Sequence, residues 1–354
     1  MKKTILFSLL MFLAFVGFLL SGCEDSLVFP TTTTTTVPPV GWAVGSQAGG
    51  YGTILYTADN GGVWTRQGSS AEIPNVGMSA VSAVDANTAW VVGSRDSGYG
   101  TIFKTTDGGD TWVRQGSALS VPDADLLGCN AVDANTCWAV GNPGVIIYTT
   151  DGGNTWNQIT SSVIPNVLLQ GVHAVNSNII WVTGDVSGGY GTVLKTTDGG
   201  STWSRLGSAS NLSNDHYLDV CGLDASTAWI VGGSYTIFKT SDGGSNWDNQ
   251  TVAQGFYDAN GVCAIDANTV WEVQDNGGIH YTTDGGTNWI TQESHAGGTF
   301  ILFVSAPNAN TAWAVGINPS GGIILNTTDA GTTWTEQATC EGGLGGVSFV
   351  GSKK

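Results

Sequence analysis

Asp85-Ala-Asn-Thr-Ala-Trp-Val-Val-Gly93 and Thr105-Thr-Asp-Gly-Gly-Asp-Thr-Trp112 decide the fold, because relatives of both stretches recur along the chain. The second occurs seven times, with its aspartates 48, 44, 47, 44, 42 and 45 residues apart. A relative of the first precedes each copy, so that all 14 tryptophans fall into the repeat, two per unit. A period of this length indicates an array of similar supersecondary units. The repeated aspartates are Asp59, Asp107, Asp151, Asp198, Asp242, Asp284 and Asp329.

Each unit is predicted to contain four strands, A to D. In the second unit we expect them at residues 81–84, 89–93, 101–105 and from Trp112 onward. The Asp-Ala-Asn-Thr turn joins A to B and the Asp-Gly-Gly turn joins C to D, because Asp, Asn and Gly bond their own backbone or accept positive φ. Four-stranded units of this length are propeller blades. The predicted fold is all-β, a seven-bladed β-propeller of four-stranded antiparallel blades.

The two ends of the repeat region are complementary. The first copy begins at strand B, residues 41–45, and lacks strand A. A strand A without a partner is left at residues 346–350. We therefore expect the last strand to complete blade 1 and close the ring, which removes an open sheet edge. An open solenoid is the alternative. The propeller domain spans residues 41–350, with a tail at 351–354.

The N-terminus has the features of a bacterial lipoprotein. Lys2-Lys3 precedes an uncharged apolar run over residues 4–19, and Leu20-Ser-Gly-Cys23 follows, which predicts an export signal at residues 1–22. The last four residues resemble the lipobox, whose cysteine is acylated. Cys23 is then the lipid anchor of an exported protein, on the periplasmic side or the cell surface. An uncleaved membrane anchor is the alternative. Residues 23–40, rich in Thr and Pro, are predicted to be a tether.

Charge and cysteine content narrow the classes of partner. The net charge is −17, and removing the leader leaves 9 basic against 28 acidic residues. Such a surface repels nucleic acid, which we exclude as a partner. Besides Cys23 there are five cysteines, an odd number whose pairing stays open: Cys129, Cys137, Cys221, Cys263 and Cys340. No cofactor is predicted.

The repeat also resembles known families. The Thr-x-Asp-x-Gly-x-Thr-Trp motif resembles the Asp-box, or bacterial neuraminidase repeat. The full unit, over residues 41–350, looks most like the photosystem II stability and assembly factor family. The resemblance implies a propeller, but the motif occurs in sialidases, glucanases, sorting receptors and assembly factors alike. We expect its Asp to accept backbone N–H groups and its Trp to pack between blades, so none of the seven aspartates is nominated as catalytic.

The arginines argue against two functions. A sialidase clamps its substrate carboxylate with clustered arginines, and the assembly factors use an Arg-rich patch. Here Arg66, Arg114 and Arg205 occupy one slot, two residues after the repeat Trp, in different blades. Only Arg95 is expected to be free for a ligand. Glycoside hydrolysis by two carboxylates is the one enzymatic reading that remains open.

Variable loops are the expected binding surface. The A–B and C–D turns share one face of a propeller, and the B–C and D–A connections share the other. Three B–C connections contain Gly-Tyr-Gly. Exposed Tyr among polar residues suits protein or carbohydrate contact, although each Tyr could instead cover its own blade. The candidate binding residues are Tyr51, Arg95, Asp96, Tyr99, Asp125, Asp185, Tyr190, His216, Tyr217 and Tyr257.

One position of the inner strand is small or polar in all seven copies. We expect these residues to line the central channel. A metal site on consecutive blades is conceivable from His173, Cys221 and Cys263, but neighbouring inner strands are too far apart for easy shared ligation, so no metal is predicted. The seven residues are Ser82, Asn130, His173, Cys221, Cys263, Ser305 and Ser348.

The sequence therefore predicts a non-enzymatic, membrane-tethered monomer that binds a protein partner or assembles an envelope complex. The alternative is a carbohydrate-binding or glycan-cleaving propeller that uses the same loops.

Overall fold

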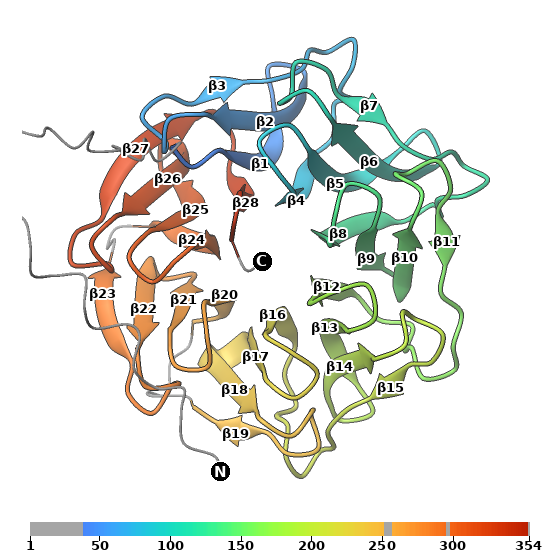
Figure 1. The fold of residues 1–354 in the computed structure, drawn as a ribbon, viewed down its shortest axis with the longest axis vertical. Coiled ribbons are helices and arrows are strands. Elements are labelled where there is room, and N and C mark those ends of the chain that lie inside the picture. Colours follow the sequence, from blue (N-terminus) through green and yellow to red (C-terminus); the bar gives the residue numbers. More distant parts are fainter. Residues whose placement is uncertain (1–37, 251–256, 295–297, 353–354) are drawn as a thin grey trace, which may run out of the picture. The chain divides into compact units, whose positions relative to one another are not determined.

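The structure, a computed structural model, consists of 28 strands in seven separate four-stranded antiparallel sheets. It describes residues 38–250, 257–294 and 298–352, so the predicted signal peptide, Cys23 and most of the tether lie outside the described residues. Figure 1 shows the sheets as blades around a common centre. The predicted seven-bladed propeller is confirmed. Among the described residues, no helix is long and apolar enough to cross a membrane.

The strands run outward from the centre in each blade. Blade 1 contains β28 (Leu344–Phe349), β1 (Gly41–Ala48), β2 (Tyr51–Thr57) and β3 (Thr65–Arg66). Blade 2 contains β4 (Met78–Ala83), β5 (Ala89–Asp96), β6 (Tyr99–Thr105) and β7 (Val113–Arg114). Blade 3 contains β8 (Asp125–Ala131), β9 (Cys137–Asn142), β10 (Val145–Thr149) and β11 (Asn157–Gln158). Blade 4 contains β12 (Leu169–Ala174), β13 (Ile180–Ser187), β14 (Tyr190–Thr196) and β15 (Ser204–Arg205). Blade 5 contains β16 (Tyr217–Gly222), β17 (Ala228–Gly232), β18 (Thr236–Thr240) and β19 (Asp248–Asn249). Blade 6 contains β20 (Ala259–Ala264), β21 (Val270–Gln274), β22 (Gly278–Thr282) and β23 (Ile290–Ser294). Blade 7 contains β24 (Phe300–Ser305), β25 (Ala312–Asn318), β26 (Gly321–Thr327) and β27 (Thr335–Cys340). A short 3₁₀ helix, η1 (Gly233–Tyr235), joins β17 to β18.

The outermost strands are shorter than expected. Strand D was predicted to start at Trp112, yet β7 begins at Val113 and has two residues. The four other D strands of blades 1 to 5 also have two residues each. The repeat Trp packs into the core and makes no backbone pair with strand C. Only the two residues that follow it pair with strand C before the chain continues to the next blade. Such short edges offer few free N–H groups to another sheet.

Ring closure joins the two ends of the described chain. β28 pairs with β1, and Phe349 lies opposite Gly41. A Cβ on Gly41 would lie 2.6 Å from the Phe349 ring, so a residue without a side chain is needed there. The fully buried Phe349 ring stacks on Trp313 of blade 7, with 3.4 Å between centroids, and meets Trp64 of blade 1 edge-on. The predicted closure is confirmed.

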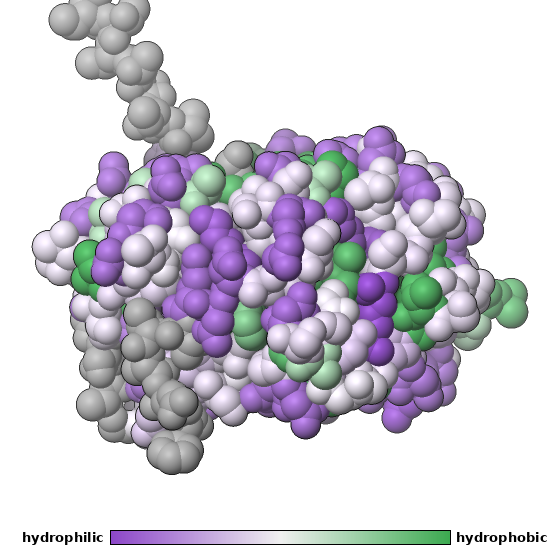
Figure 2. Space-filling model, turned by 90° about the horizontal axis from the view of Figure 1, so that it is seen from below, coloured by the Kyte–Doolittle hydropathy of each residue, from purple (hydrophilic) through white to green (hydrophobic). Residues whose placement is uncertain are grey.

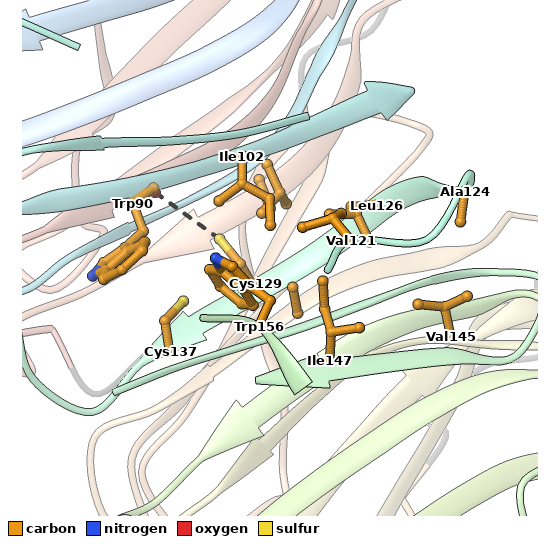
Figure 3. Packing of buried hydrophobic residues seen from close by; sticks show 13 residues of the cluster. Trp90, Ile102, Val121, Ala124, Leu126, Cys129, Cys137, Val145, Ile147 and Trp156 are labelled. Atoms are coloured by element: carbon orange, nitrogen blue, oxygen red, sulfur yellow. Dashed lines mark hydrogen bonds between the residues drawn. The ribbon is translucent and has the colours of Figure 1, made fainter. Parts of the chain in front are cut away.

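The core consists of interfaces between neighbouring blades. At the interface of blades 2 and 3, Trp90 meets Trp156 edge-to-face at 5.8 Å between centroids. Figure 3 shows this pair with Ile102, Leu126 and Ile147 in one apolar cluster. Edge-to-face tryptophan pairs recur at three further interfaces. Each blade therefore buries its Trp against its neighbour, and no blade has a complete core by itself.

The seven small or polar residues of the inner strands are buried, and Asn130 and Ser348 among them also line the cavity around the axis. All are at most 5% exposed. Five accept a backbone N–H from the next inner strand at 3.0–3.2 Å: Ser348, Ser82, Asn130, Cys221 and Ser305. The expected lining of the central cavity therefore holds for Asn130 and Ser348, while the contact that five of the seven share is a hydrogen bond to the neighbouring blade.

Residues three positions earlier line the cavity around the axis. Leu127, Leu218 and Leu302 come from alternate blades, with Gln170 and Asn260 between them. The cavity measures about 240 Å³. Among the described residues, no group of three or more His, Cys, Asp or Glu side chains could hold a metal ion.

The repeated aspartates organise the C–D turns. Asp107 Oδ1 accepts the Thr111 N–H at 3.0 Å and the Thr105 hydroxyl at 2.8 Å. The Gly109 N–H in turn binds Thr105 Oγ1. Hydrogen bonds from the Thr111 side chain and backbone lower the pKa of Asp107 to about 2. The same pattern of an Asp acceptor, a Thr two residues before it and a backbone N–H four residues after it occurs in all seven turns.

Blade 6 has a polar cluster where the other blades are apolar. Glu272 of β21 is 0% exposed, at a position that holds Ala, Val or Ile elsewhere. The Gln274 Nε2 group donates to Glu272 Oε2 at 3.2 Å. The other carboxyl oxygen, Glu272 Oε1, has no hydrogen-bond partner in the described structure. His280 lies opposite on β22, against the ring of Tyr235. Burial raises the pKa of Glu272 well above its usual value and lowers the pKa of His280 to about 4, so burial favours the uncharged form of each side chain.

We expect Phe349→Ala to lower the free energy of unfolding by about 3–5 kcal/mol, because it removes a fully buried ring between two blades. Phe300→Ala is the matched control, since Phe300 is 46% exposed and its truncation should cost less than about 1 kcal/mol. Urea unfolding of both variants measures this difference. Equal losses in the two variants would show that the closure contact does not stabilise the ring.

Glu272 should make stability depend on pH. Its pKa is raised in the folded state, so unfolding releases a proton above the unfolded pKa, and stability falls as pH rises toward the folded pKa. One such proton changes the free energy of unfolding by up to about 1.4 kcal/mol per pH unit. Glu272→Gln should remove this contribution, so its stability relative to the wild type should rise as pH increases above the unfolded pKa of about 4.3. The exposed Glu336→Gln is the control, and urea unfolding that gives parallel pH profiles for wild type and Glu272→Gln would contradict the assignment.

Candidate functional site

The propeller has two chemically different faces. The A–B and C–D turns lie together, as the bond from Gly108 N–H to the Asn87 carbonyl shows within blade 2. The B–C and D–A connections meet at the other end, where Ser46 N–H donates to the Gly343 carbonyl. We call this second surface the loop face. It carries the candidate residues, because its connections differ from blade to blade while the turns of the first face repeat.

Three B–C hairpins on the loop face share one construction. Each has a two-residue turn with positive φ at both positions: Gly49-Gly50, Ser97-Gly98 and Gly188-Gly189. This is the geometry of the tight turn that matches strand twist. The Tyr after each turn begins strand C, which places Tyr51, Tyr99 and Tyr190 half-buried at the tips of their blades.

An arginine from strand D covers each of these tyrosines. The guanidinium carbons of Arg66, Arg114 and Arg205 lie 3.9, 4.1 and 4.3 Å from the ring centroids of Tyr51, Tyr99 and Tyr190. Each guanidinium also donates to the carbonyl of the residue before the turn: Ala48, Asp96 and Ser187. The hairpin, the ring and the arginine therefore hold one another in place, as cation–π and hydrogen-bond contacts require.

Sequence reasoning missed this pairing, although a signal exists. The interval from Tyr to Arg is 15 residues in all three blades, and no other blade has either residue in these slots. The arginines were placed on strand D without a partner. For the tyrosines, the sequence left two interpretations open: contact with a ligand, or packing over their own blade. The structure gives them one face against Arg and leaves the rest of each ring partly accessible.

The richest charged cluster of the loop face lies at blades 2 and 3. Arg95 is exposed, with Asp123 at 4.0 Å, and its backbone N–H donates to Asp125 Oδ1 at 2.9 Å. Asp96 binds Arg114 at 2.6 Å. That hydrogen bond lowers the pKa of Asp96 and keeps it ionised. The structure thus brings together four of the predicted residues: Arg95, Asp96, Tyr99 and Asp125.

A second cluster lies at blades 5 and 6. His216 stands between Asp215 and Asp258, at 3.2 and 3.4 Å. Asp275 Oδ1 accepts the Asp258 N–H, and partial burial together with the Asp258 charge raises the pKa of Asp275. Asp215, Asp258 and Asp275 were not predicted, because nothing in the repeat brings their blades together. Tyr257, 50% exposed, precedes Asp258 directly.

Four predicted residues stand apart from these clusters: Tyr51, Asp185, Tyr190 and Tyr217. Tyr217 is 0% exposed, with its hydroxyl against Ser213, so it belongs to the core and not to the loop face. Its place at the start of β16 turns the ring inward, against Phe238. Asp185 lies beside the Tyr190 hairpin in blade 4, and Tyr51 lies in blade 1. The candidate set is therefore spread around the ring and not gathered in one pocket.

The surface shown in Figure 2 is mostly hydrophilic or intermediate, with hydrophobic residues in small separate patches. Four of the five propeller cysteines, Cys129, Cys137, Cys221 and Cys263, are buried, and Cys340 is partly accessible. Burial raises the pKa of Cys129 to about 12, which makes that thiol unreactive. On the loop face, the three tyrosines and the charged groups lie beside the exposed hydrophobic residues Val186, Phe300 and Ile317.

Comparison with known proteins agrees with this architecture. Residues 75–178 and 172–307 match the model of the family described as photosynthesis system II assembly factor YCF48. YCF48 bound to a D1 peptide has a TM-score of 0.57 and 20% identity, over 74% of this chain and 82% of that one. YCF48 from Cyanidioschyzon merolae has a TM-score of 0.59 and 18% identity, over 83% and 94%. A comparison with curated proteins returns no match.

Enzymes share the same fold. The GH74 enzyme of Niastella koreensis has a TM-score of 0.52 and 15% identity, over 88% of this chain and 68% of that one. At such identities these likenesses show the fold alone. The family match covers more than half of the sequence and agrees with the repeat, the closure and the blade structure. The chain belongs to the family of YCF48-like photosystem II assembly factor propellers.

Proposed function

We propose that this chain is a non-enzymatic binding propeller that holds a protein partner on its loop face and serves the assembly or stability of a membrane or envelope complex. The observation that carries the proposal is the set of three Tyr–Arg hairpins on blades 1, 2 and 4. Rings that are already fixed lose little side-chain entropy on binding, and tyrosine is a residue that interfaces favour. Family membership supports the same role, since one relative has been solved with a D1 peptide.

The charge of the loop face suits a partner segment with groups of both signs. Arg95 is exposed beside Asp123 and Asp125, while Arg66, Arg114 and Arg205 are engaged with their own hairpins. The surface therefore lacks a block of free arginines, and the net charge of the chain is −17. We infer a partner that contacts the tyrosine edges and pairs with single charges, not a strongly acidic one.

Membrane attachment through Cys23 is part of the same proposal. The signal-like residues 1–22 and the Thr- and Pro-rich residues 23–40 support an exported, acylated protein whose tether holds the propeller near the membrane. A tethered propeller would then encounter a membrane-bound partner at a high effective local concentration.

A second candidate function is glycan binding or hydrolysis. It is favoured by the fold shared with a GH74 enzyme and by the carboxylates of Asp215, Asp258 and Asp275 on the loop face. Hydrolysis requires two carboxyl groups at opposite sides of a glycosidic bond.

The binding role predicts that the triple variant Tyr51→Ala, Tyr99→Ala, Tyr190→Ala captures at least about tenfold less partner from detergent-solubilised membranes than the wild type. Asp110→Ala is the control, since Asp110 is exposed on a C–D turn of the opposite face and should leave capture unchanged. Capture is quantified by mass spectrometry. Undiminished capture by the triple variant excludes the hairpins as the site, and cleavage of a glycan panel that Asp258→Asn abolishes would favour the second function.

The anchor predicts that Cys23→Ser abolishes incorporation of a radiolabelled fatty acid and releases the protein from the membrane fraction. Cys340→Ser, at a partly accessible thiol of the propeller, is the control and should retain both. Equal labelling of the two variants would show that Cys23 is not the acylated residue.

A further inference from the structure

The cavity on the axis is lined by a ring of residues from the same position near the start of each inner strand, which we call the axial ring. It has leucine at three alternate blades, with Gln170 and Asn260 between them. Ser79 and Gly345 complete it on the side of blades 1 and 2. Because each inner strand begins where a D–A connection arrives, the axial ring lies at the loop-face end of the axis.

Gly345 widens this cavity although the backbone does not require a glycine there. A Cβ on Gly345 would have the Ser79 carbonyl oxygen as its nearest neighbour, at 3.6 Å, which is ordinary van der Waals contact. Its φ is not positive, and three other blades carry leucine at the same position. The cavity of about 240 Å³ is smaller than the ~300–1,000 Å³ of sites for drug-sized ligands, so it suits a ligand of side-chain size.

The lining of the cavity contains one acidic residue and, among the described residues, no Lys, Arg or His. Asp219 follows the axial ring directly in blade 5 and is 3% exposed. Its Oδ1 and Oδ2 accept the N–H groups of Val220 and Val262, each at 2.9 Å, which fixes the carboxylate across blades 5 and 6. The corresponding residue is Gly or Ala in five other blades. A carboxylate without a basic residue in the same lining favours a cation over an anion.

The rest of the lining decides which kind of cation fits. Asn260 Nδ2 donates to the Ile301 carbonyl at 2.9 Å, which orients the amide and leaves Oδ1 as its acceptor. Gln170 supplies a second amide two blades away. An ammonium group has three N–H donors, and its methylene stem packs well against leucine. A metal ion fits less well, since no group of three or more His, Cys, Asp or Glu side chains in the described part of the chain could hold one.

We propose that the axial cavity is a binding site for a primary alkylammonium group, which enters from the loop face. The ammonium lies beside Asp219 and the amide oxygens of Gln170 and Asn260, and its stem packs between the leucines of the axial ring. The group belongs either to a free amine or to a lysine side chain of a polypeptide. The site does not involve the tyrosine hairpins, so its failure would leave the proposed partner binding intact.

The first test compares n-pentylammonium with 1-pentanol, its uncharged match, by titrating the full-length protein with ¹³C-labelled leucine methyl groups. We expect pentylammonium to shift the methyl signals of Leu127, Leu218 and Leu302 and to bind at least about tenfold more tightly than 1-pentanol, because only the amine carries a charge. Leu119, which is 99% exposed, is the internal reference and should not shift. Equal affinities for the amine and the alcohol, or no shift at the three leucines, would overturn the proposal.

The second test fills the cavity or removes its charge. Gly345→Leu should abolish pentylammonium binding, because a fourth leucine occupies the side of the cavity at blades 1 and 2. Gly77→Leu is the matched control, since a Cβ there would lie 3.8 Å from its nearest neighbour and outside the lining, and it should bind like the wild type. Asp219→Asn should weaken pentylammonium at least about tenfold and change 1-pentanol by less than about twofold. Wild-type affinity in a folded Gly345→Leu variant would exclude the cavity as the site.

The source of the ammonium group is the third question. N-acetyl-lysine-N-methylamide carries the group on a peptide unit, and its ε-acetylated form lacks the charge. Binding of the first compound that is lost on ε-acetylation assigns the cavity to a lysine of a polypeptide, whereas binding of pentylammonium alone assigns it to a free amine. Equal binding of the two lysine compounds would contradict a site that recognises the ammonium.

Discussion

The insertion of Phe349 between Trp313 and Trp64 is the contact on which the rest of the molecule depends. No blade of this propeller has its own core, because each buries its tryptophans against the next blade. Without β28, blade 1 would lose its inner strand and the ring would have two open edges. The position of Phe349 holds Ala or Gly in the other six blades, so the closing pair of Phe349 with Gly41 is distinct from its counterparts.

Ring closure also explains how loops that differ in sequence from blade to blade can be held in defined positions. The hydrogen bonds that inner-strand residues accept from the next blade tie the blades at the centre, and the C–D turns tie them at the rim. The loop face is therefore displayed on a rigid ring. On it, the same hairpin is used three times, with Arg and Tyr 15 residues apart, and each copy is stable within its own blade. A partner meets tyrosines that are already placed, which lowers the entropic cost of binding.

Blades 5 and 6 depart from the repeat from core to surface. Glu272 and His280 replace apolar residues inside blade 6, and His216 lies between carboxylates at the surface. Buried polar groups weaken a core unless they are fully paired, and one oxygen of Glu272 lacks a partner in the described residues.

The sequence alone determined the repeat, the number of blades, the order of strands within them and the closure, because each depends on local turn chemistry and on a period that recurs seven times. It also located the loop face, and on it Arg95, Tyr99 and Asp125. Only the tertiary structure decided which of these side chains meet. Tyr217 is buried because its strand turns it inward, and five of the inner-strand residues accept a hydrogen bond from the next blade. Asp215, His216 and Asp258 come together because blade 5 packs against blade 6, which places the start of β16 beside the start of β20, a juxtaposition that no local pattern encodes.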